Sequence, residues 1–250
     1  MLKLKDLLKD ILNEGVDDPG ILKAVFLAGG PASGKSYVAS NLFGIPEKIN
    51  ISATGLKMVN QDKELENLLD KYGFGHDLDN MPVDLFRQLT DPDYENYSGA
   101  RKFTKELSKV RLKHYTNGRL GVIIDGTGHQ YGKIAAQKKK LENIGYDSYM
   151  IFVNTSLEVA LQRNQSRDRV VPEKIVKKSW EDVQNNLGKF QGLFGNNFIV
   201  VDNSKFLKPK DAQNKFSMLT KKYIDKFVKK PVKNKQGQAW IKKQRILKKR

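Results

Sequence analysis

The chain has 250 residues, of which 39% are hydrophobic, and a formal net charge of +17 at pH 7. That length can bury the core of one domain with an appendage. Because there is no Cys, the chain can hold no disulfide, thiol nucleophile or thiolate-bound metal, which fits a reducing cytoplasm. No stretch is apolar for long enough to span a bilayer, so we expect no contact with the membrane interior.

The chain begins with MLKLKDLLKDIL, in which apolar residues follow helical spacing at Leu4, Leu7, Leu8, Ile11 and Leu12. Charged residues interrupt the leucines, so this stretch is not a secretory signal. We expect a short amphipathic helix within residues 1–20 that docks on the body of the protein or on a partner.

The next 184 residues, 21–204, alternate strand-like and helix-like patterns. Apolar, β-branched or aromatic runs predict strands at 24–28, 57–60, 121–125, 148–153 and 198–201. Helical spacing predicts helices over 99–116, 131–144 and 156–166 and a further helix with Pro172 at its first position. Thr155 and Glu158 match a capping box. This alternation predicts an α/β sandwich with a parallel sheet and right-handed crossovers.

Two segments depart from the alternation. Residues 72–99 are acidic, aromatic and rich in turn formers, which indicates an insertion or a lid. Residues 205–250 carry 17 Lys and Arg against two Asp, a net charge of +15, and show helical spacing over 211–229. Such a segment attracts polyanions, and nucleic acid is the partner it would fit. The alternative is a solvated basic helix and tail without a partner.

The strand at 24–28 runs into a glycine-rich loop that fits G-x-x-x-x-G-K-[ST] and opens a helix. Glycines let the backbone approach a ligand closely, so successive N–H groups can converge on phosphate oxygens. Lys35 supplies a charge for the β- and γ-phosphates, and Ser36 supplies a hydroxyl ligand for Mg²⁺. The nucleotide-binding residues expected here are Gly29, Gly30, Pro31, Ala32, Ser33, Gly34, Lys35, Ser36 and Tyr37.

Two acidic residues follow later strands, where ligands of parallel sheets bind. Asp62 could accept the proton of an acceptor hydroxyl as a general base, or cap the helix that follows it. Asp125 ends the third predicted strand and could hold Mg²⁺ through water or orient an acceptor or an arginine. A turn former followed by glycines is the alternative interpretation of Asp125.

The segment RNQSRDRVVPE adds arginines at the end of a helix and beyond it. Arg163 and Arg167 could fold over the phosphates and stabilise charge on the transferred group. A solvated basic helix end would give the same pattern.

Together, G-x-P-x-S-G-K-S, N-x-D, a strand ending D-x-T and R-N-x-x-R…V-P resemble the kinase domain of bacteriophage-type polynucleotide 5′-kinases. They are also similar to the wider group of small P-loop kinases that includes zeta toxins. The resemblance covers residues 23–204 and implies a five-stranded parallel sheet in the order 2-3-1-4-5 with ATP as donor. It implies that Asp62 is the general base, Asp125 a second active-site acid and Arg163 and Arg167 lid arginines. It also implies that residues 202–204 lie near the adenine.

One position departs from the pattern of the polynucleotide kinases, which carry an Arg three residues after the catalytic Asp. Here that position is Leu65, and Lys63 or Arg101 would have to replace it. Three functions therefore stay open. The first is an ATP- and Mg²⁺-dependent kinase acting on a hydroxyl, with a nucleic-acid 5′ end as one candidate acceptor. The others are a zeta-toxin-like kinase of a nucleotide-sugar and an ATP-binding docking protein that transfers no phosphate.

Overall fold

The structure is a computed structural model, and it describes residues 16–18, 20–46, 51–62, 65–66, 69, 99–166 and 170–248. For residues 99–103 it describes the backbone alone. The predicted N-terminal helix and the predicted insertion at 72–99 therefore fall almost entirely outside the described residues. Among those that are described, no helix combines the length and the apolar character needed to cross a bilayer.

Five parallel strands form one sheet, and their order is β2-β3-β1-β4-β5. The strands are β1 (Lys23–Ala28), β2 (Lys57–Asn60), β3 (Val122–Asp125), β4 (Asp147–Asn154) and β5 (Phe198–Asp202). Each lies within one residue of its predicted range at either end. The predicted α/β class and the predicted strand order are both confirmed.

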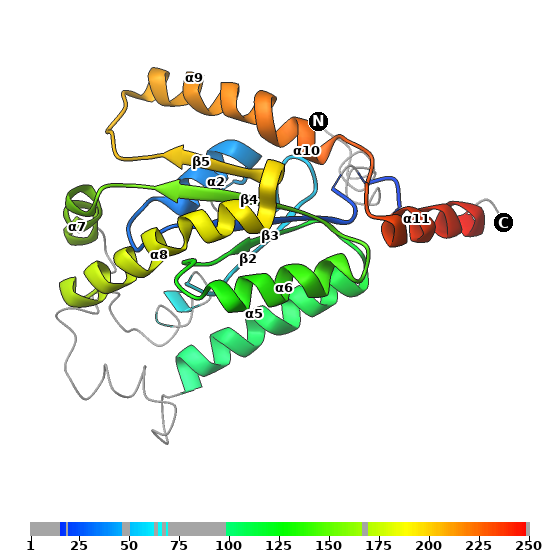
Figure 1. Cartoon of the computed structure of the whole chain (residues 1–250), viewed down its shortest axis with the longest axis horizontal. Coiled ribbons are helices and arrows are strands. Elements are labelled where there is room, and N and C mark those ends of the chain that lie inside the picture. The colour runs from blue at the N-terminus through cyan, green and yellow to red at the C-terminus, as the bar shows by residue number, and fades with distance from the viewer. Residues whose placement is uncertain are drawn as a thin grey trace, which may run out of the picture.

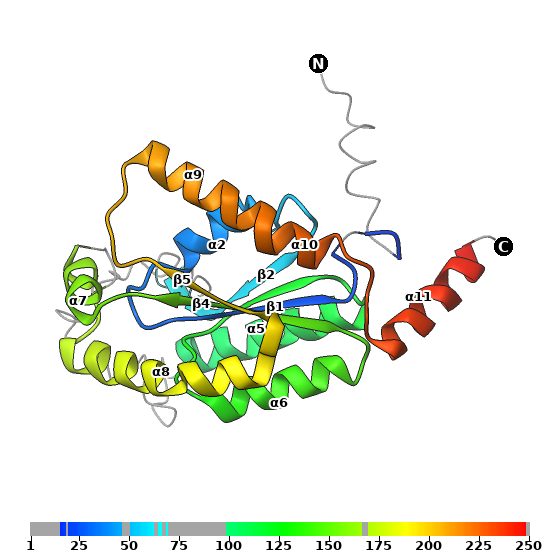
Figure 2. The same cartoon turned by 45° about the horizontal axis from the view of Figure 1, so that its top comes forward.

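Helices cover both faces of the sheet, and the continuous apolar strands reflect this double burial (Figure 1). Figure 2 shows α2, α9 and α10 on one side and α5, α6 and α8 on the other. The helices are α2 (Lys35–Phe43), α5 (Gly99–Asn117), α6 (Tyr131–Glu142), α7 (Leu157–Gln165), α8 (Glu173–Phe194), α9 (Pro209–Leu219), α10 (Asp225–Val228) and α11 (Lys235–Lys248).

The basic C-terminal segment is part of the packed structure. Ala212, Phe216, Ile224, Phe227 and Val228 are each less than 10% exposed and join the core between α2 and the sheet. Their lysine neighbours point to solvent, so α9 and α10 present a cationic outer face over an apolar inner one. The single helix predicted at 211–229 is α9 and α10 joined by one π-helical stretch, Thr220–Ile224.

Two predicted helix starts are wrong by one residue. The N-cap of α7 is Ser156, whose hydroxyl accepts a hydrogen bond from the Val159 amide at 3.3 Å, whereas Thr155 bonds to the Asn203 carbonyl instead. Pro172 is the N-cap of α8 and not its first helical residue. In both cases the chain remains extended for one residue longer than the sequence pattern suggested.

A buried ion pair fixes the C-terminal helix to the amino-terminal edge of the sheet. The Lys23 ammonium, 2% exposed, lies 3.0 Å from the Asp147 carboxylate. That carboxylate also accepts hydrogen bonds from the backbone amides of Lys233 and Asn234 at 2.9 and 3.0 Å. Burial lowers the pKa of Lys23, and the bond to Asp147 opposes that shift. Asp147 thus joins β1, β4 and the segment that leads into α11.

We expect Asp147→Ala to lower the free energy of unfolding by about 3 kcal/mol, because it leaves the Lys23 charge buried without its partner. The matched control is Asp225→Ala, which removes a more exposed pair with Lys229 and should cost about 0.5 kcal/mol. Urea unfolding measures both. Equal losses in the two variants would contradict the anchoring role of Asp147.

Candidate functional site

The glycine-rich loop sits between β1 and α2 at the carboxyl edge of the sheet. Gly34 is the N-cap of α2 with φ +81°, and a Cβ there would lie 2.5 Å from the Asn203 amide nitrogen. A Cβ on Gly29 would lie 2.6 Å from the Val153 carbonyl oxygen. Ala32 also adopts a positive φ, +54°. Neighbouring elements thus hold the loop in a tight turn that leaves no room for side chains at Gly29 and Gly34.

Lys35 folds back over this loop. Its ammonium donates to the carbonyls of Gly29 and Gly30 at 3.0 and 3.3 Å. The positive charge is therefore already at the mouth of the loop, where a phosphate could replace the carbonyls as its partner. Sequence analysis predicted the charge of Lys35 at this loop, and the two hydrogen bonds hold the ammonium in that position.

Three side chains of the loop and of the start of α2 differ in exposure. Ser33 is fully buried, and its hydroxyl has no hydrogen-bond partner among the described residues. Ser36 is exposed, and Tyr37 is 50% exposed with its ring edge against Phe216 at 5.5 Å between centroids. An unpaired buried hydroxyl within the loop fits a ligand with acceptor oxygens, such as a phosphate.

Asn203 ties the loop to the last strand, a role that sequence analysis did not assign to it when it placed residues 202–204 near the adenine. Its amide nitrogen donates to the Ser33 carbonyl at 2.8 Å, across 170 residues of sequence. Its backbone amide bonds to the Asn154 carbonyl at 2.8 Å, which extends the β4–β5 pairing. The position directly after β5 and the resemblance drew attention to the 202–204 segment, but neither indicated this bond to the loop.

Arg163, predicted as a lid arginine, lies beside the loop. Its guanidinium donates to the Asn203 carbonyl at 2.8 Å and is 3.9 Å from a Cβ built on Gly34. It also stacks on the ring of Phe206 at 4.8 Å from the centroid, and that ring is 67% exposed. Partial burial lowers the pKa of Arg163, although the group stays charged at any ordinary pH.

Trp180 of α8 packs against the other side of the loop. Its ring would be 3.4 Å from a Cβ on Gly30, and its indole nitrogen donates to the Thr155 carbonyl at 2.8 Å. Sequence analysis assigned Trp180 no role beyond its place in the helix predicted to follow Pro172. Its contact with Gly30 gives this tryptophan a second role in shaping the loop.

Asn60 connects the two acidic residues. Its side-chain nitrogen donates to the Asp125 carboxylate at 2.8 Å, and its side-chain oxygen Oδ1 accepts from the Asp62 backbone amide at 2.8 Å. Asn60 and Asp125 are register partners at the ends of β2 and β3. Asn60 is therefore the residue that caps the helix that begins after β2. The interpretation of Asp62 as the cap is wrong, and its carboxylate lies exposed in the first turn.

The loop after β3 closes the site on the side of β1. The Gly29 amide donates to the Thr127 carbonyl at 3.1 Å. Asn186 of α8 donates to the carbonyls of Gly128 and His129 at 3.1 and 3.0 Å. The His129 ring bonds to the Thr127 hydroxyl, and desolvation lowers the pKa of His129. The loop is thus held from β1 and from α8.

The remaining candidates fall into two groups. Arg167 and Lys63 lie outside the described residues, as does the side chain of Arg101. Leu65, which occupies the position of an expected arginine, is described and is only 4% exposed. That position serves the core, so it offers nothing to an acceptor phosphate.

A Mg²⁺ ion would find few protein ligands at this edge. Within the described ranges no three His, Asp or Glu side chains gather into a metal-binding group. Mg²⁺ commonly uses one or two protein oxygens, substrate phosphates and water. The Ser36 hydroxyl at the start of α2 and the Asp125 carboxylate at the end of β3 fit such a sparse ligand set.

Residues 25–189 match the family model described as an AAA domain. Among solved structures, the chain is similar to the PezAT toxin–antitoxin system of Streptococcus pneumoniae, with 11% identity, a TM-score of 0.47 and coverage of 91% of this chain and 95% of that chain. It is also similar to a gluconokinase from Sinorhizobium meliloti, with 14% identity, a TM-score of 0.43 and coverage of 80% and 95%.

A chain of an RNA repair complex gives 16% identity and a TM-score of 0.46 over 68% of this chain and 46% of that chain. These three structures share 11–16% sequence identity with the chain, and their TM-scores are below 0.5. The activity is therefore inferred from this chain's own residues.

We expect Asn203→Ala to weaken ADP binding about tenfold, because the loop loses one net hydrogen bond of about 1–1.5 kcal/mol. The matched control is Asn197→Ala, directly before β5, which removes a similar bond to the Ser148 carbonyl of β4. Calorimetric titration with ADP and Mg²⁺ measures the affinities. Unchanged ADP affinity in Asn203→Ala, or an equal loss in the control, would contradict the role given to Asn203.

Proposed function

The chain belongs to the family of AAA domains, and on that premise we propose that it is an ATP- and Mg²⁺-dependent kinase that phosphorylates a hydroxyl group. One observation carries the proposal. A single edge of the sheet brings together the glycine-rich loop, here called the phosphate loop, and a guanidinium held beside Gly34. At the same edge, the Asn60 side chain bonds to the Asp125 carboxylate and to the backbone amide of Asp62. A donor site and an exposed acid beside it are what phosphoryl transfer requires.

The donor would bind across the loop and the end of β5. The backbone amides of residues 30, 32 and 34–36 and the Lys35 ammonium would hold the phosphates, with the buried Ser33 hydroxyl as a further donor. The exposed Phe206 ring, with Arg163 stacked on it, offers a flat surface for the adenine. This agrees with the expectation that residues 202–204 lie near the base.

Ser36 and Asp125 would hold Mg²⁺, which neutralises negative charge on the phosphates when it is bound. Arg163 would stabilise the charge that spreads over the transferred group. We extend this role to Arg167, four residues further along the chain, as a second lid arginine.

The reaction would proceed by direct transfer. The acceptor oxygen forms a bond to the γ-phosphorus while the bond to the β,γ-bridging oxygen breaks and ADP leaves. The acceptor's proton passes to the exposed Asp62 carboxylate, which acts as general base. The Asn60 side chain holds Asp125 through its amide nitrogen and the Asp62 backbone through its amide oxygen Oδ1, so it sets the spacing between base and metal ligand.

Two acceptor classes have support. A nucleic-acid 5′-hydroxyl suits the cationic outer face of α9 and α10, where Lys221, Lys222 and Lys226 line a shallow groove beside Met218. A small acceptor, such as a nucleotide-sugar, suits the burial of Leu65, because this position cannot grip the phosphate of a strand.

The test of the kinase proposal is transfer of labelled γ-phosphate from ATP to a 5′-hydroxyl oligonucleotide and to a panel of nucleotide-sugars and nucleosides. We expect label on one acceptor class and a loss of 10²–10⁴-fold in kcat for Asp62→Asn, since removal of a general base has that effect. Asp211→Asn, an exposed acid in the first turn of α9, should keep full activity.

The outcome also separates the alternatives. Label on the oligonucleotide would identify a polynucleotide kinase, and label on a small molecule would identify the other acceptor class. Tight ATP binding without transfer to any acceptor would contradict the kinase proposal and favour an ATP-dependent docking protein.

Binding of nucleic acid to the cationic face of α9 and α10 is tested by point substitutions. Truncation at residue 205 is unsuitable, because it would remove core residues such as Phe216 and Phe227. For single-stranded DNA, the logarithm of the affinity falls linearly with the logarithm of the salt concentration. Changing Lys221, Lys222 and Lys226 to Gln should make the slope of that line less negative by about 2. Fluorescence anisotropy with a labelled oligonucleotide measures this slope.

The control for that measurement removes the same charge from the opposite layer, by changing Lys105, Lys109 and Lys113 of α5 to Gln. If both triple variants shift the slope equally, binding follows net charge alone, and no particular face holds the strand.

A further inference from the structure

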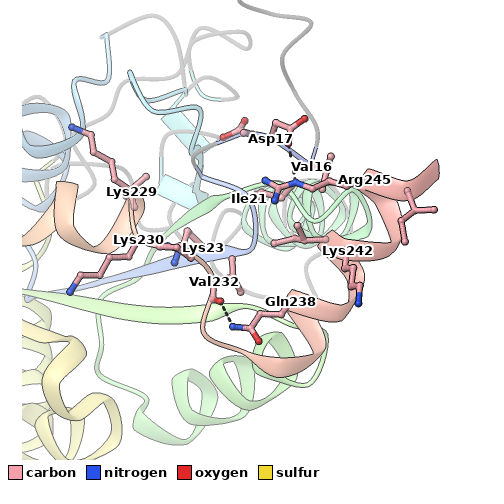
Figure 3. Close-up of a pocket in the computed structure, with 15 residues that line it drawn as sticks. Val16, Asp17, Ile21, Lys23, Lys229, Lys230, Val232, Gln238, Lys242 and Arg245 are labelled. Atoms are coloured by element: carbon pink, nitrogen blue, oxygen red, sulfur yellow. Dashed lines mark hydrogen bonds and ion pairs between the residues drawn. The ribbon is translucent and has the colours of Figure 1, made fainter. Parts of the chain in front are cut away.

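A cleft of about 600 Å³ lies at the amino-terminal edge of the sheet, at the opposite end of the strands from the phosphate loop. Figure 3 shows it between α11, the segment after α10 and the start of β1. Its apolar wall is formed by Val16, Ile21, Val228, Val232, Ile241 and Ile246. Nothing in the proposed reaction uses this cleft.

The cleft is a built feature, because α11 is fixed to the body at both of its ends. Near its start, Gly237 packs so closely on the Gly145 carbonyl that a Cβ would lie 2.3 Å from that oxygen. Toward its other end, Arg245 and Lys248 pair with Asp17 at 3.2 and 2.9 Å. The helix therefore spans the edge of the sheet with the cleft beneath it.

Part of the apolar surface beside the cleft is exposed. Ile246 and Leu247 of α11 are each 51% exposed, although the cleft floor at Val228 and Val232 is buried. Two cations on the rim, Lys230 and Lys242, have no acidic partner among the described residues. The cleft thus offers an apolar floor and a free basic rim, and an amphipathic segment with acidic residues would complement it.

The chain itself supplies such a segment. Val16 forms part of the cleft wall, so residues 1–15 join the described chain at the cleft. Their apolar positions Leu4, Leu8 and Ile11 recur at helical spacing. An isolated helix this short is marginal in water and gains its stability by burying that stripe.

Charge and length agree with this match. The acidic residues Asp6, Asp10 and Glu14 are spaced by four, so in a helix they form a row along one side of the apolar stripe. A helix of residues 2–14 would be about 20 Å long, nearly the length of the 14-residue α11. We propose that residues 2–14 form an amphipathic helix that docks in this cleft of the same chain, with Leu4, Leu8 and Ile11 against α11 and the acidic row toward Lys230 and Lys242.

The absence of Cys from the chain makes a direct test available. The double variant Leu8→Cys with Ile246→Cys, treated with a short bismaleimide, should give an intramolecular cross-link, read as a monomer by electrophoresis and assigned by mass spectrometry. The matched control is Lys9→Cys with Ile246→Cys, because Lys9 lies one residue along and about 100° around the helix. We expect at least tenfold slower cross-linking in the control.

A second measurement uses the single variant Ile246→Cys with and without residues 2–14. Deletion of the segment should raise the rate of thiol labelling at least tenfold. Equal cross-linking of Leu8→Cys and Lys9→Cys, or unchanged labelling after deletion, would overturn the proposal. Cross-links that form only between two chains would also overturn it, since a second copy would then fill the cleft. ATP binding reports on the other edge of the sheet, so failure here leaves the kinase proposal untouched.

Discussion

The parallel register of the five strands is the constraint on which the candidate site depends. Leu27 of β1 and Asn60 of β2 are both register partners of Asp125 in β3. The phosphate loop that follows β1, the helix cap Asn60 and the acid Asp125 therefore lie at the same height along the sheet. A shift of one strand by a single residue would move its site residue to the other face. The same parallel pairing requires helices on both faces, which hold the surrounding loops in place.

The two edges of the sheet are organised by different chemistry. At the carboxyl edge, Asn203 and Arg163 form a polar network around the phosphate loop. At the amino edge, the buried pair of Lys23 and Asp147 fastens the segment that leads to α11. The basic C-terminal segment connects the two edges, because α9 starts near Phe206 beside the loop and α11 ends beside Asp17. Its lysines are therefore displayed on a rigid layer and not on a free tail.

Local sequence predicted the strands, the glycine-rich loop and the neighbourhood of Arg163, and a resemblance added the strand order. Those features depend on patterns within ten or twenty residues. Sequence analysis placed residues 202–204 near the adenine, but it missed the bond of Asn203 to Ser33, because that bond joins residues 170 positions apart. Asn60 was missed because Asp62, two residues later, looked like the cap. The packing of Phe216 and Phe227 was hidden by the many lysines around them, since composition reports charge and not which face carries it.

The measurement that tests the central claim most directly is backbone amide NMR of the ¹⁵N-labelled chain titrated with a non-hydrolysable ATP analogue and Mg²⁺. The account predicts that the largest shifts fall on the amides of residues 29–36, apart from Pro31, and of residues 125–129, with none along α11. Shifts confined to the lysine-rich faces of α9 to α11, with residues 29–36 unchanged, would contradict it.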